Sequence, residues 1–153
     1  MPNNDTSGPD EGRLGSGSGS AEPVPWQSCI TTLLEQEPPF IPDRAQAMTL
    51  LVQYPPGYPG IPPHRHTGPA FGYVIEGEML FELEGEPERV VRAGESFWEP
   101  GGDVIHYQDG NNQAGQWLRF VVVMLCEQGR PMLTFVDDGE LAARRDRRAP
   151  RPS

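Results

Sequence analysis

The sequence predicts an all-β protein, a β-sandwich or a small barrel, on three observations. Short stretches of strand-type residues are separated by turn signals about every 8–12 residues. The 18 glycines and 18 prolines fit a turn-rich β-protein better than a helical bundle. No segment before residue 137 has convincing helical periodicity. A length of 153 residues favours one domain.

Residues 1–25 are predicted to form a disordered arm. The alternating Gly-Ser run at residues 15–20 is typical of a flexible linker, and almost nothing in the arm is apolar enough to be buried. The β-domain is expected to cover residues 26–136, beginning with a strand at residues 29–34.

Residues 45–54 alternate as a β-strand does. One face carries Met48, Leu50, Val52 and Tyr54, and the mixed opposite face fits either a cavity lining or ordinary sandwich core. Further strands are expected at residues 70–76, 79–83, 90–91, 96–99, 104–108, 117–126 and 132–136.

Residues 137–153 are predicted to form a short helix and an Arg-rich tail. Within residues 140–145 the acid comes first and the arginines last, as the helix dipole favours. We expect the tail to be solvated, with binding of an acidic partner as the alternative. Acidic residues at every second position also predict a solvated outer face at Glu82, Glu84, Glu86 and Glu88.

The charge distribution excludes several classes of function. The net charge is −10, and residues 144–153 contribute +4 from five Arg and one Asp, which leaves −14 on the rest of the chain. Such a body is not expected to bind nucleic acid. The chain has no Lys, which excludes Schiff-base chemistry and the P-loop lysine. Catalysis would have to use His, carboxylates, Tyr or a metal.

The sequence also favours a cytoplasmic protein without a membrane partner. No apolar run approaches the roughly 18–20 residues that span a bilayer. The N-terminus lacks the basic-then-apolar pattern of a signal peptide. Cys29 and Cys126 show no CxxC spacing, so reduced thiols are expected, with a disulfide as the alternative.

The three histidines carry the strongest functional signal. His64 and His66 are two residues apart, so an extended strand points both imidazoles the same way and Arg65 the other way. Two adjacent imidazoles form half of a transition-metal site, and the alternative is a surface or hydrogen-bonded pair. His106 follows 40 residues after His66, a separation over which a compact barrel can return a side chain to the same point.

The sequence around these residues resembles the two conserved motifs of the cupin family. The first family motif is answered by His64, His66 and Gly77, and the second by Gly94, Pro100, Gly102 and His106. The resemblance covers roughly residues 45–126 and implies a jelly-roll β-barrel. It also implies one divalent transition metal, held inside the barrel by the three histidines.

Two departures from the family pattern bear on the site. Ala70 occupies the position of the metal-binding Glu, and a methyl group cannot bind a cation. His106 lies one residue later than the family spacing places it, which on a strand would turn it to the other face. A bulge at Gly101 and Gly102 would absorb the extra residue.

A site of three histidines without a carboxylate resembles that of cupin dioxygenases that cleave β-diketones and that of the three-histidine thiol dioxygenases. The resemblance implies oxidative cleavage of a small chelating organic molecule, with Fe(II) favoured and Zn, Mn or Ni as alternatives. A non-catalytic cupin that binds or senses a small molecule, and a metal-dependent isomerase or lyase, remain open. A homodimer that covers the edge strands is expected.

Strand alternation predicts which other side chains face the metal. Ala70 and Gly72 would open space beside it, Val74 would make that space apolar, and Gln108 would offer a neutral amide. The alternative for each is plain barrel packing, or for Gln108 a surface position.

Two acidic residues flank the third histidine. Asp103 or Asp109 could orient an imidazole through its second nitrogen, and turn capping is the alternative for both.

Overall fold

The computed structural model describes residues 25–151, and the chain divides into two compact units, Met1–Thr31 and Thr32–Ser153. In the first unit the described element is a 3₁₀-helix, η1 (Trp26–Cys29). The predicted arm lies almost entirely outside the described residues. The strand predicted at residues 29–34 is wrong, because residues 30–44 form no strand in the described chain. Strand-type residues need a partner strand to complete their hydrogen bonds, and this segment has none.

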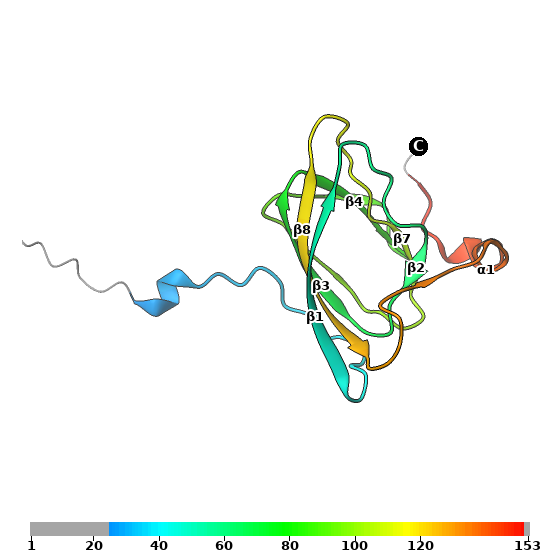
Figure 1. Ribbon diagram of the computed structural model, residues 1–153, viewed down its shortest axis with the longest axis horizontal. Coiled ribbons are helices and arrows are strands. Elements are labelled where there is room, and N and C mark those ends of the chain that lie inside the picture. Colours follow the sequence, from blue (N-terminus) through cyan, green and yellow to red (C-terminus); the bar gives the residue numbers. More distant parts are fainter. Residues whose placement is uncertain (1–24, 152–153) are drawn as a thin grey trace, which may run out of the picture. The chain divides into compact units, whose positions relative to one another are not determined.

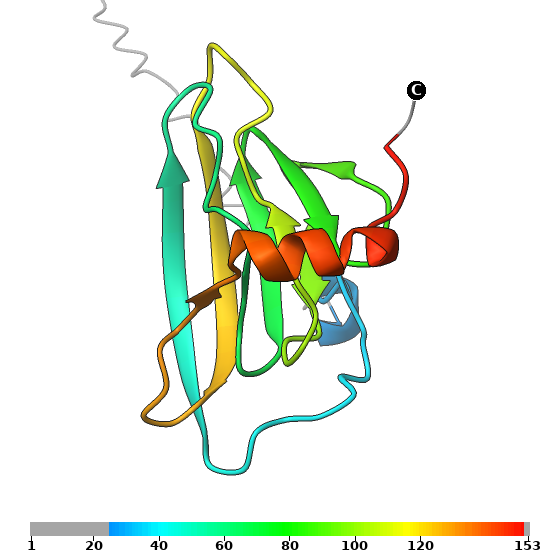
Figure 2. The same cartoon turned by 90° about the vertical axis from the view of Figure 1, so that its right-hand side faces the viewer.

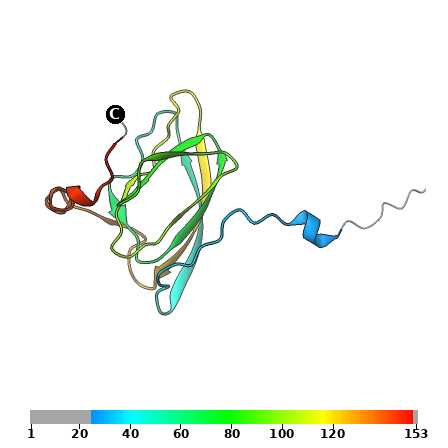
Figure 3. The ribbon, with the colours of Figure 1, turned by 180° about the vertical axis from the view of Figure 1, so that it is seen from behind.

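The second unit consists of two antiparallel sheets that face each other (Figures 1 and 3). One sheet has the order β1-β8-β3-β6, and the other has the order β5-β4-β7-β2-β9. The strands of the first sheet are β1 (Ala45–Tyr54), β8 (Leu118–Glu127), β3 (Ala70–Glu76) and β6 (Ser96–Glu99). Those of the second are β5 (Arg89–Arg92), β4 (Glu78–Leu83), β7 (His106–Gln108), β2 (His64–Arg65) and β9 (Thr134–Phe135). The predicted all-β jelly roll is confirmed.

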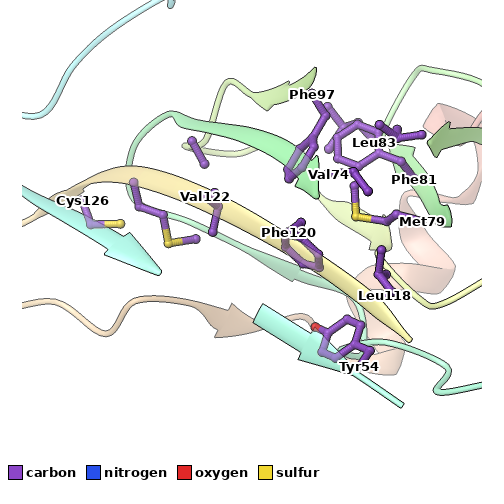
Figure 4. Close-up of a cluster of buried hydrophobic side chains, with 13 residues drawn as sticks. Tyr54, Val74, Met79, Phe81, Leu83, Phe97, Leu118, Phe120, Val122 and Cys126 are labelled. Atoms are coloured by element: carbon purple, nitrogen blue, oxygen red, sulfur yellow. The ribbon is translucent and has the colours of Figure 1, made fainter. Parts of the chain in front are cut away.

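The core lies between the two sheets (Figure 4). Strand β8 alternates strictly, burying Leu118, Phe120, Val122, Met124 and Cys126 while the residues between them face outward. Phe97 of β6 packs against rings from both layers, with centroids 5.3 Å from Phe81 and 5.7 Å from Phe120. Each such buried side chain contributes about 1.5–3 kcal/mol of hydrophobic stabilisation. The sheets are therefore fixed together close to one end of the cavity described below.

Glycines fix two connections that determine the strand register. Gly77 joins β3 to β4 at φ 83°, where a Cβ would lie 2.4 Å from the Trp117 carbonyl oxygen. Between β6 and β7, Gly101 and Gly102 both have positive φ, 72° and 67°. Only glycine adopts two such conformations in succession without strain. After this turn His106 is buried, on the strand that pairs with His64.

The C-terminal segment packs against the second sheet (Figure 2). Helix α1 (Asp138–Ala143) begins after Asp137, whose Oδ1 accepts a hydrogen bond from the Glu140 N–H at 2.8 Å. The 3₁₀-helix η2 (Arg145–Arg147) follows. On β2, Arg65 faces away from the histidines and binds Glu140 through both carboxylate oxygens, at 2.5 and 3.3 Å. The helix is thus attached to β2.

The expectation of a solvated acidic face and a solvated Arg tail is wrong for Glu82, Glu84, Arg144 and Arg148. It holds for Glu86, Arg145, Arg147 and Arg151, which are exposed. Glu82 is 1% exposed, and its two oxygens accept hydrogen bonds from Arg148 at 2.6 and 2.7 Å. Arg144 is 8% exposed, binds both oxygens of Glu84 and donates to Asp103 Oδ1 at 2.9 Å. Charge complementarity between two segments far apart in sequence buries both. We name Arg65, Arg144, Arg148, Glu82, Glu84, Asp103 and Glu140 the C-terminal ion-pair network.

Both cysteines are free thiols, Cys29 exposed and Cys126 buried. Within residues 25–151, no helix has the length and apolar character needed to cross a bilayer.

Candidate metal centre

The three histidines converge at one end of the space between the sheets. His64 and His106 are directly paired across β2 and β7, and their ring centroids are 5.0 Å apart. The rings of His64 and His66 are 4.9 Å apart. One nitrogen from each ring lies within 4.8 Å of the other two, and all three residues are buried. Three buried imidazoles so placed could hold a transition metal.

Backbone carbonyls fix the tautomer of every ring. His64 Nδ1 donates to the Pro62 carbonyl at 2.8 Å, and His66 Nδ1 donates to the Met132 carbonyl at 2.7 Å. His106 is held through its other nitrogen, with Nε2 donating to the Gln108 carbonyl at 2.8 Å. Because a carbonyl only accepts, each neutral ring keeps an unprotonated nitrogen for the centre. This orienting hydrogen bond is the usual support of a metal-binding imidazole.

A carboxylate that the sequence analysis did not assign to the site lies beside the imidazoles. Glu99 Oε2 is 3.1 Å from His106 Nδ1 and 3.6 Å from His66 Nε2, and the Glu99 side chain is 7% exposed. The side chains placed to hold one ion are the three histidines, as the sequence predicted, and Glu99 is a charged neighbour that the sequence analysis did not foresee. Glu99 ends β6, where it shares the buried parity of Phe97. The sequence signal that could have identified it is an acid on the core-facing parity of a strand, immediately before Pro100.

The electrostatics of these groups are mutually dependent. Burial pushes the pKa of Glu99 up, but the nearby imidazoles, His106 foremost, outweigh burial and bring that pKa to about 2. Burial likewise pushes the pKa of His106 down, and the negative charge of Glu99 reverses the shift so that it is raised. The pKa of His64 is lowered, chiefly by burial and then by the neighbouring His106. The carboxylate is thus ionised and attracts positive charge.

The small residues of β3 face large residues of β6 across the sheet. Ala70 pairs with Glu99, and Gly72 pairs with Phe97. A Cβ built on Gly72 would lie 2.0 Å from the Phe97 ring, so the glycine is required by that ring. The space that Ala70 and Gly72 were expected to open beside a metal is therefore taken by these two side chains.

The four predicted pocket residues do not line the cavity that the histidines border. Ala70 and Val74 are fully buried in the hydrophobic core. Gln108 is partly buried, and its Oε1 accepts a hydrogen bond from Gly110 N at 2.9 Å. None of the four predicted pocket residues is among those that border this cavity. Strand alternation predicts which side chains face the interior of the barrel. It does not predict how close to the histidines each of them lies.

The two acids that flank His106 have other partners. Asp109 Oδ2 accepts from the Tyr54 hydroxyl at 2.9 Å, and its Oδ1 accepts from Ile61 N at 2.7 Å. Asp103 belongs to the C-terminal ion-pair network. Neither holds an imidazole, because the three backbone carbonyls already do so.

A cavity of about 60 Å³ borders the three histidines and Glu99. By this measure one ordered water needs about 10–15 Å³, so a few waters or a small ligand would fit. Besides the polar end, Tyr54 and Asp109 provide a second polar point. The remaining walls are mostly apolar: Leu50, Val52, Ile61, Met79, Phe97, Phe120, Val122, Met124, Met132 and Leu133.

Fold and site together define a class of protein, a small jelly-roll barrel with inward-facing imidazoles at one end. A family model described as Cupin domain matches residues 50–124, the part of the chain that carries all three histidines and Glu99. The chain belongs to the cupin family. The three histidines at its cavity are those that the family resemblance implied as metal ligands.

Solved structures with a similar fold come from several organisms. The DMSP lyase DddQ from Ruegeria pomeroyi DSS-3 is 21% identical with a TM-score of 0.49, and the match covers 59% of this chain and 43% of DddQ. The polyketide cyclase RemF from Streptomyces resistomycificus is 28% identical with a TM-score of 0.46, covering 60% of this chain and 63% of RemF. A predicted oxalate decarboxylase from Thermotoga maritima is 24% identical with a TM-score of 0.46, covering 54% and 68%. With TM-scores below 0.5, these matches carry no argument about this chain's reaction. Among curated proteins, no similar sequence was found.

Proposed function

We propose that the protein is an enzyme that binds one divalent transition metal through His64, His66 and His106 and acts on a small organic molecule with two oxygen donors. The observation that carries the proposal is the set of three buried imidazoles. Each is oriented by a backbone carbonyl, and each keeps one nitrogen for the centre. His106 Nδ1 is buried without a hydrogen-bond partner, as expected of an atom that binds a metal.

The residues around the centre would select and orient the substrate. When bound, the metal would supply a Lewis acid that polarises a substrate oxygen. The apolar walls would exclude water and strengthen electrostatic interactions inside. Burial, reinforced by Asp109, raises the pKa of Tyr54 and keeps its hydroxyl protonated. Because that hydroxyl donates to Asp109, its oxygen would remain free to accept from a substrate hydroxyl. A hydroxy-carbonyl or enol suits this arrangement.

Lewis-acid chemistry of the lyase or isomerase kind is the reaction class that we propose first. The expectation of oxidative cleavage rested on a centre without a carboxylate, and Glu99 lies 3.1 Å from His106. Oxidative cleavage by Fe(II) is the second candidate. It is favoured by the three imidazoles, a ligand type that suits Fe as well as Zn and Ni.

Elemental analysis of freshly purified, never-chelated protein tests this proposal. We expect about one equivalent of Mn, Fe, Ni or Zn. Oxygen consumption with a β-dicarbonyl would select oxidative cleavage, and conversion of a 2-hydroxy ketone without oxygen uptake would select the lyase or isomerase class. Protein that contains no metal and takes up none from Mn²⁺ or Zn²⁺ solutions would leave a non-catalytic binding or sensing protein as the correct alternative.

The sequence predicts a homodimer that covers edge strands, and we propose instead a homodimer through the outer face of the first sheet. Leu51, Val121 and Tyr73 pair across β1, β8 and β3 in one row, and Val123, Phe71 and Trp98 follow in the next. The exposed fractions are 58% for Leu51 and 36% for Val123. A contiguous apolar surface of this kind is typical of an interface. Light scattering after size exclusion would show a dimer for the native chain and a monomer for Val123→Glu. The two free thiols fit a reducing compartment, and we propose the cytoplasm.

A further inference from the structure

The carboxylate of Glu99 requires a positive partner that the cavity's other side chains do not permanently provide. Its side chain is 7% exposed and lies between His106 and His66. Among the described residues that border the cavity there is no Arg. An ionised carboxylate buried without a cation is strongly unfavourable. A metal ion held by the neighbouring imidazoles would supply that cation.

The geometry favours a shared cation over a hydrogen bond. Glu99 Oε2 lies 3.1 Å from His106 Nδ1, and yet that nitrogen has no hydrogen-bond partner. Two atoms that bind one metal have this spacing, because bonds of about 2.0–2.2 Å at a right angle place the ligands about 3 Å apart. Their lone pairs then point at the ion and not along the line between them.

We propose that Glu99 is a fourth protein ligand of the metal, supplied by β6 in place of the carboxylate that residue 70 of β3 lacks. This inference rests on the proposed function, since it needs a metal at the three histidines. Ala70 and Glu99 are direct cross-strand partners. Such partners share one face with their Cβ atoms about 4.5–5.5 Å apart, so a carboxylate can reach the centre from either strand.

A relocated carboxylate changes which ligands the centre accepts. With Glu99 bound, a divalent metal carries a net charge of +1, where three imidazoles alone would leave +2. A monoanionic chelate such as an enolate then neutralises the centre, and a dianion does not. The carboxylate also favours oxygen-preferring metals such as Mn²⁺ over imidazole-preferring ones such as Zn²⁺.

Calorimetric titration of metal-stripped full-length protein with Mn²⁺ and with Zn²⁺ tests the assignment. Glu99→Gln keeps the side-chain shape and removes the charge, and we expect Mn²⁺ affinity to fall about 100-fold and Zn²⁺ affinity to fall less. The matched control is Glu82→Gln, which removes a carboxylate that is 1% exposed but pairs with Arg148 outside the cavity. That variant should bind both metals as the native chain does.

A second-site variant separates ligand loss from damage to the fold. Glu99→Ala removes the carboxylate and vacates the space opposite residue 70. Adding Ala70→Glu restores a carboxylate from the other strand, so the double variant should recover at least tenfold of the lost Mn²⁺ affinity. Circular dichroism confirms that each variant is folded.

The outcomes distinguish the two proposals. Native binding of Mn²⁺ together with unchanged affinity in Glu99→Gln would overturn the fourth ligand and leave the three-histidine function standing. Equal losses of Mn²⁺ and Zn²⁺ affinity without recovery in the double variant would also overturn it. If the native chain binds neither metal, the proposed function itself fails.

Discussion

Two clusters of buried charge in this protein are built on opposite principles. In the C-terminal ion-pair network, Glu84 and Glu82 each accept two hydrogen bonds from a guanidinium, Arg144 and Arg148 respectively. In the cavity, one carboxylate lies beside two of three imidazoles, and each of the three is oriented by a backbone carbonyl. The first cluster pairs its opposite charges with one another, although Arg65 Nε is buried without a hydrogen-bond partner, whereas the second presents unprotonated nitrogens and a negative charge to a common point.

The contrast separates a structural cluster from a functional one. In a bidentate pair the guanidinium and the carboxylate neutralise each other, and a guanidinium has no lone pair that could bind a metal. Imidazoles that are held through one nitrogen leave the other available. The atom without a partner also differs between the two clusters. In the cavity it is His106 Nδ1, whose lone pair can bind a cation, and in the ion-pair network it is Arg65 Nε, an N–H donor that cannot.

The largest expected effect is on metal binding, after His64→Ala. Losing one imidazole should weaken metal binding by more than about 100-fold. At free metal 100-fold above its Kd, the native chain gains about 2.7 kcal/mol of stability and the variant should gain almost none. Thermal unfolding with and without Zn²⁺ measures this difference.

The control for that variant is Phe135→Ala. Phe135 pairs with His64 in the sheet but is 62% exposed. It should keep the metal-induced stabilisation. Full metal occupancy in His64→Ala would refute the site.

An intermediate effect is expected for Arg144→Ala, on stability alone. The change leaves the Glu84 carboxylate, 9% exposed, without its guanidinium. Breaking such a pair should reduce the free energy of unfolding by about 2–4 kcal/mol. Urea unfolding measures the loss, and metal affinity should be unchanged.

The neighbouring Arg145 provides the control for this prediction. Its side chain is 82% exposed, so Arg145→Ala should change the free energy of unfolding by less than about 0.5 kcal/mol. A loss of metal affinity in Arg144→Ala as large as in His64→Ala would contradict the separation of the two clusters.

The smallest effect is expected for Asp103→Asn, and it depends on pH. The hydrogen bond from Arg144 lowers the pKa of Asp103 below its ordinary value. A lowered pKa means that the ionised form stabilises the fold above the unfolded pKa of about 3.9, and that this is lost as the pH falls through the folded pKa. With the side chain 75% exposed, the stabilisation should stay below about 0.5 kcal/mol.

Urea unfolding at pH 7 and pH 3 measures that difference. The native chain should be slightly more stable than Asp103→Asn at pH 7, and the gap should narrow at pH 3. A gap that widens in acid would show that the sign is wrong.

The sequence predicted what depends on local parity and spacing. Alternation on one strand placed His64 and His66 inward and Arg65 outward, and the glycine-rich turn indicated how His106 returns to them. The barrel followed from the turn spacing and the family motifs. These features depend on neighbours in the chain, which a sequence displays directly.

What the sequence did not reveal depends on pairing between distant segments. Glu99 reaches the centre because β6 lies in register against Ala70 of β3, and no local pattern gives that register. Glu82 and Glu84 were predicted to be solvated because the arginines that pair with them, Arg148 and Arg144, lie about 60 residues later in the chain. The small residues of β3 were assigned to a pocket because their large partners on β6 could not be seen.

Arg65 connects the two clusters within a single short strand. The rings of His64 and His66, on either side of it, point at the centre. Its guanidinium donates two hydrogen bonds to Glu140 of α1 on the opposite side of the sheet. The C-terminal helix contributes no histidine of its own, yet it supports β2, which carries His64 and leads directly into His66. Changes in the tail would therefore alter the rigidity of the segment that carries His64 and His66. They would leave the set of side chains around the centre unchanged.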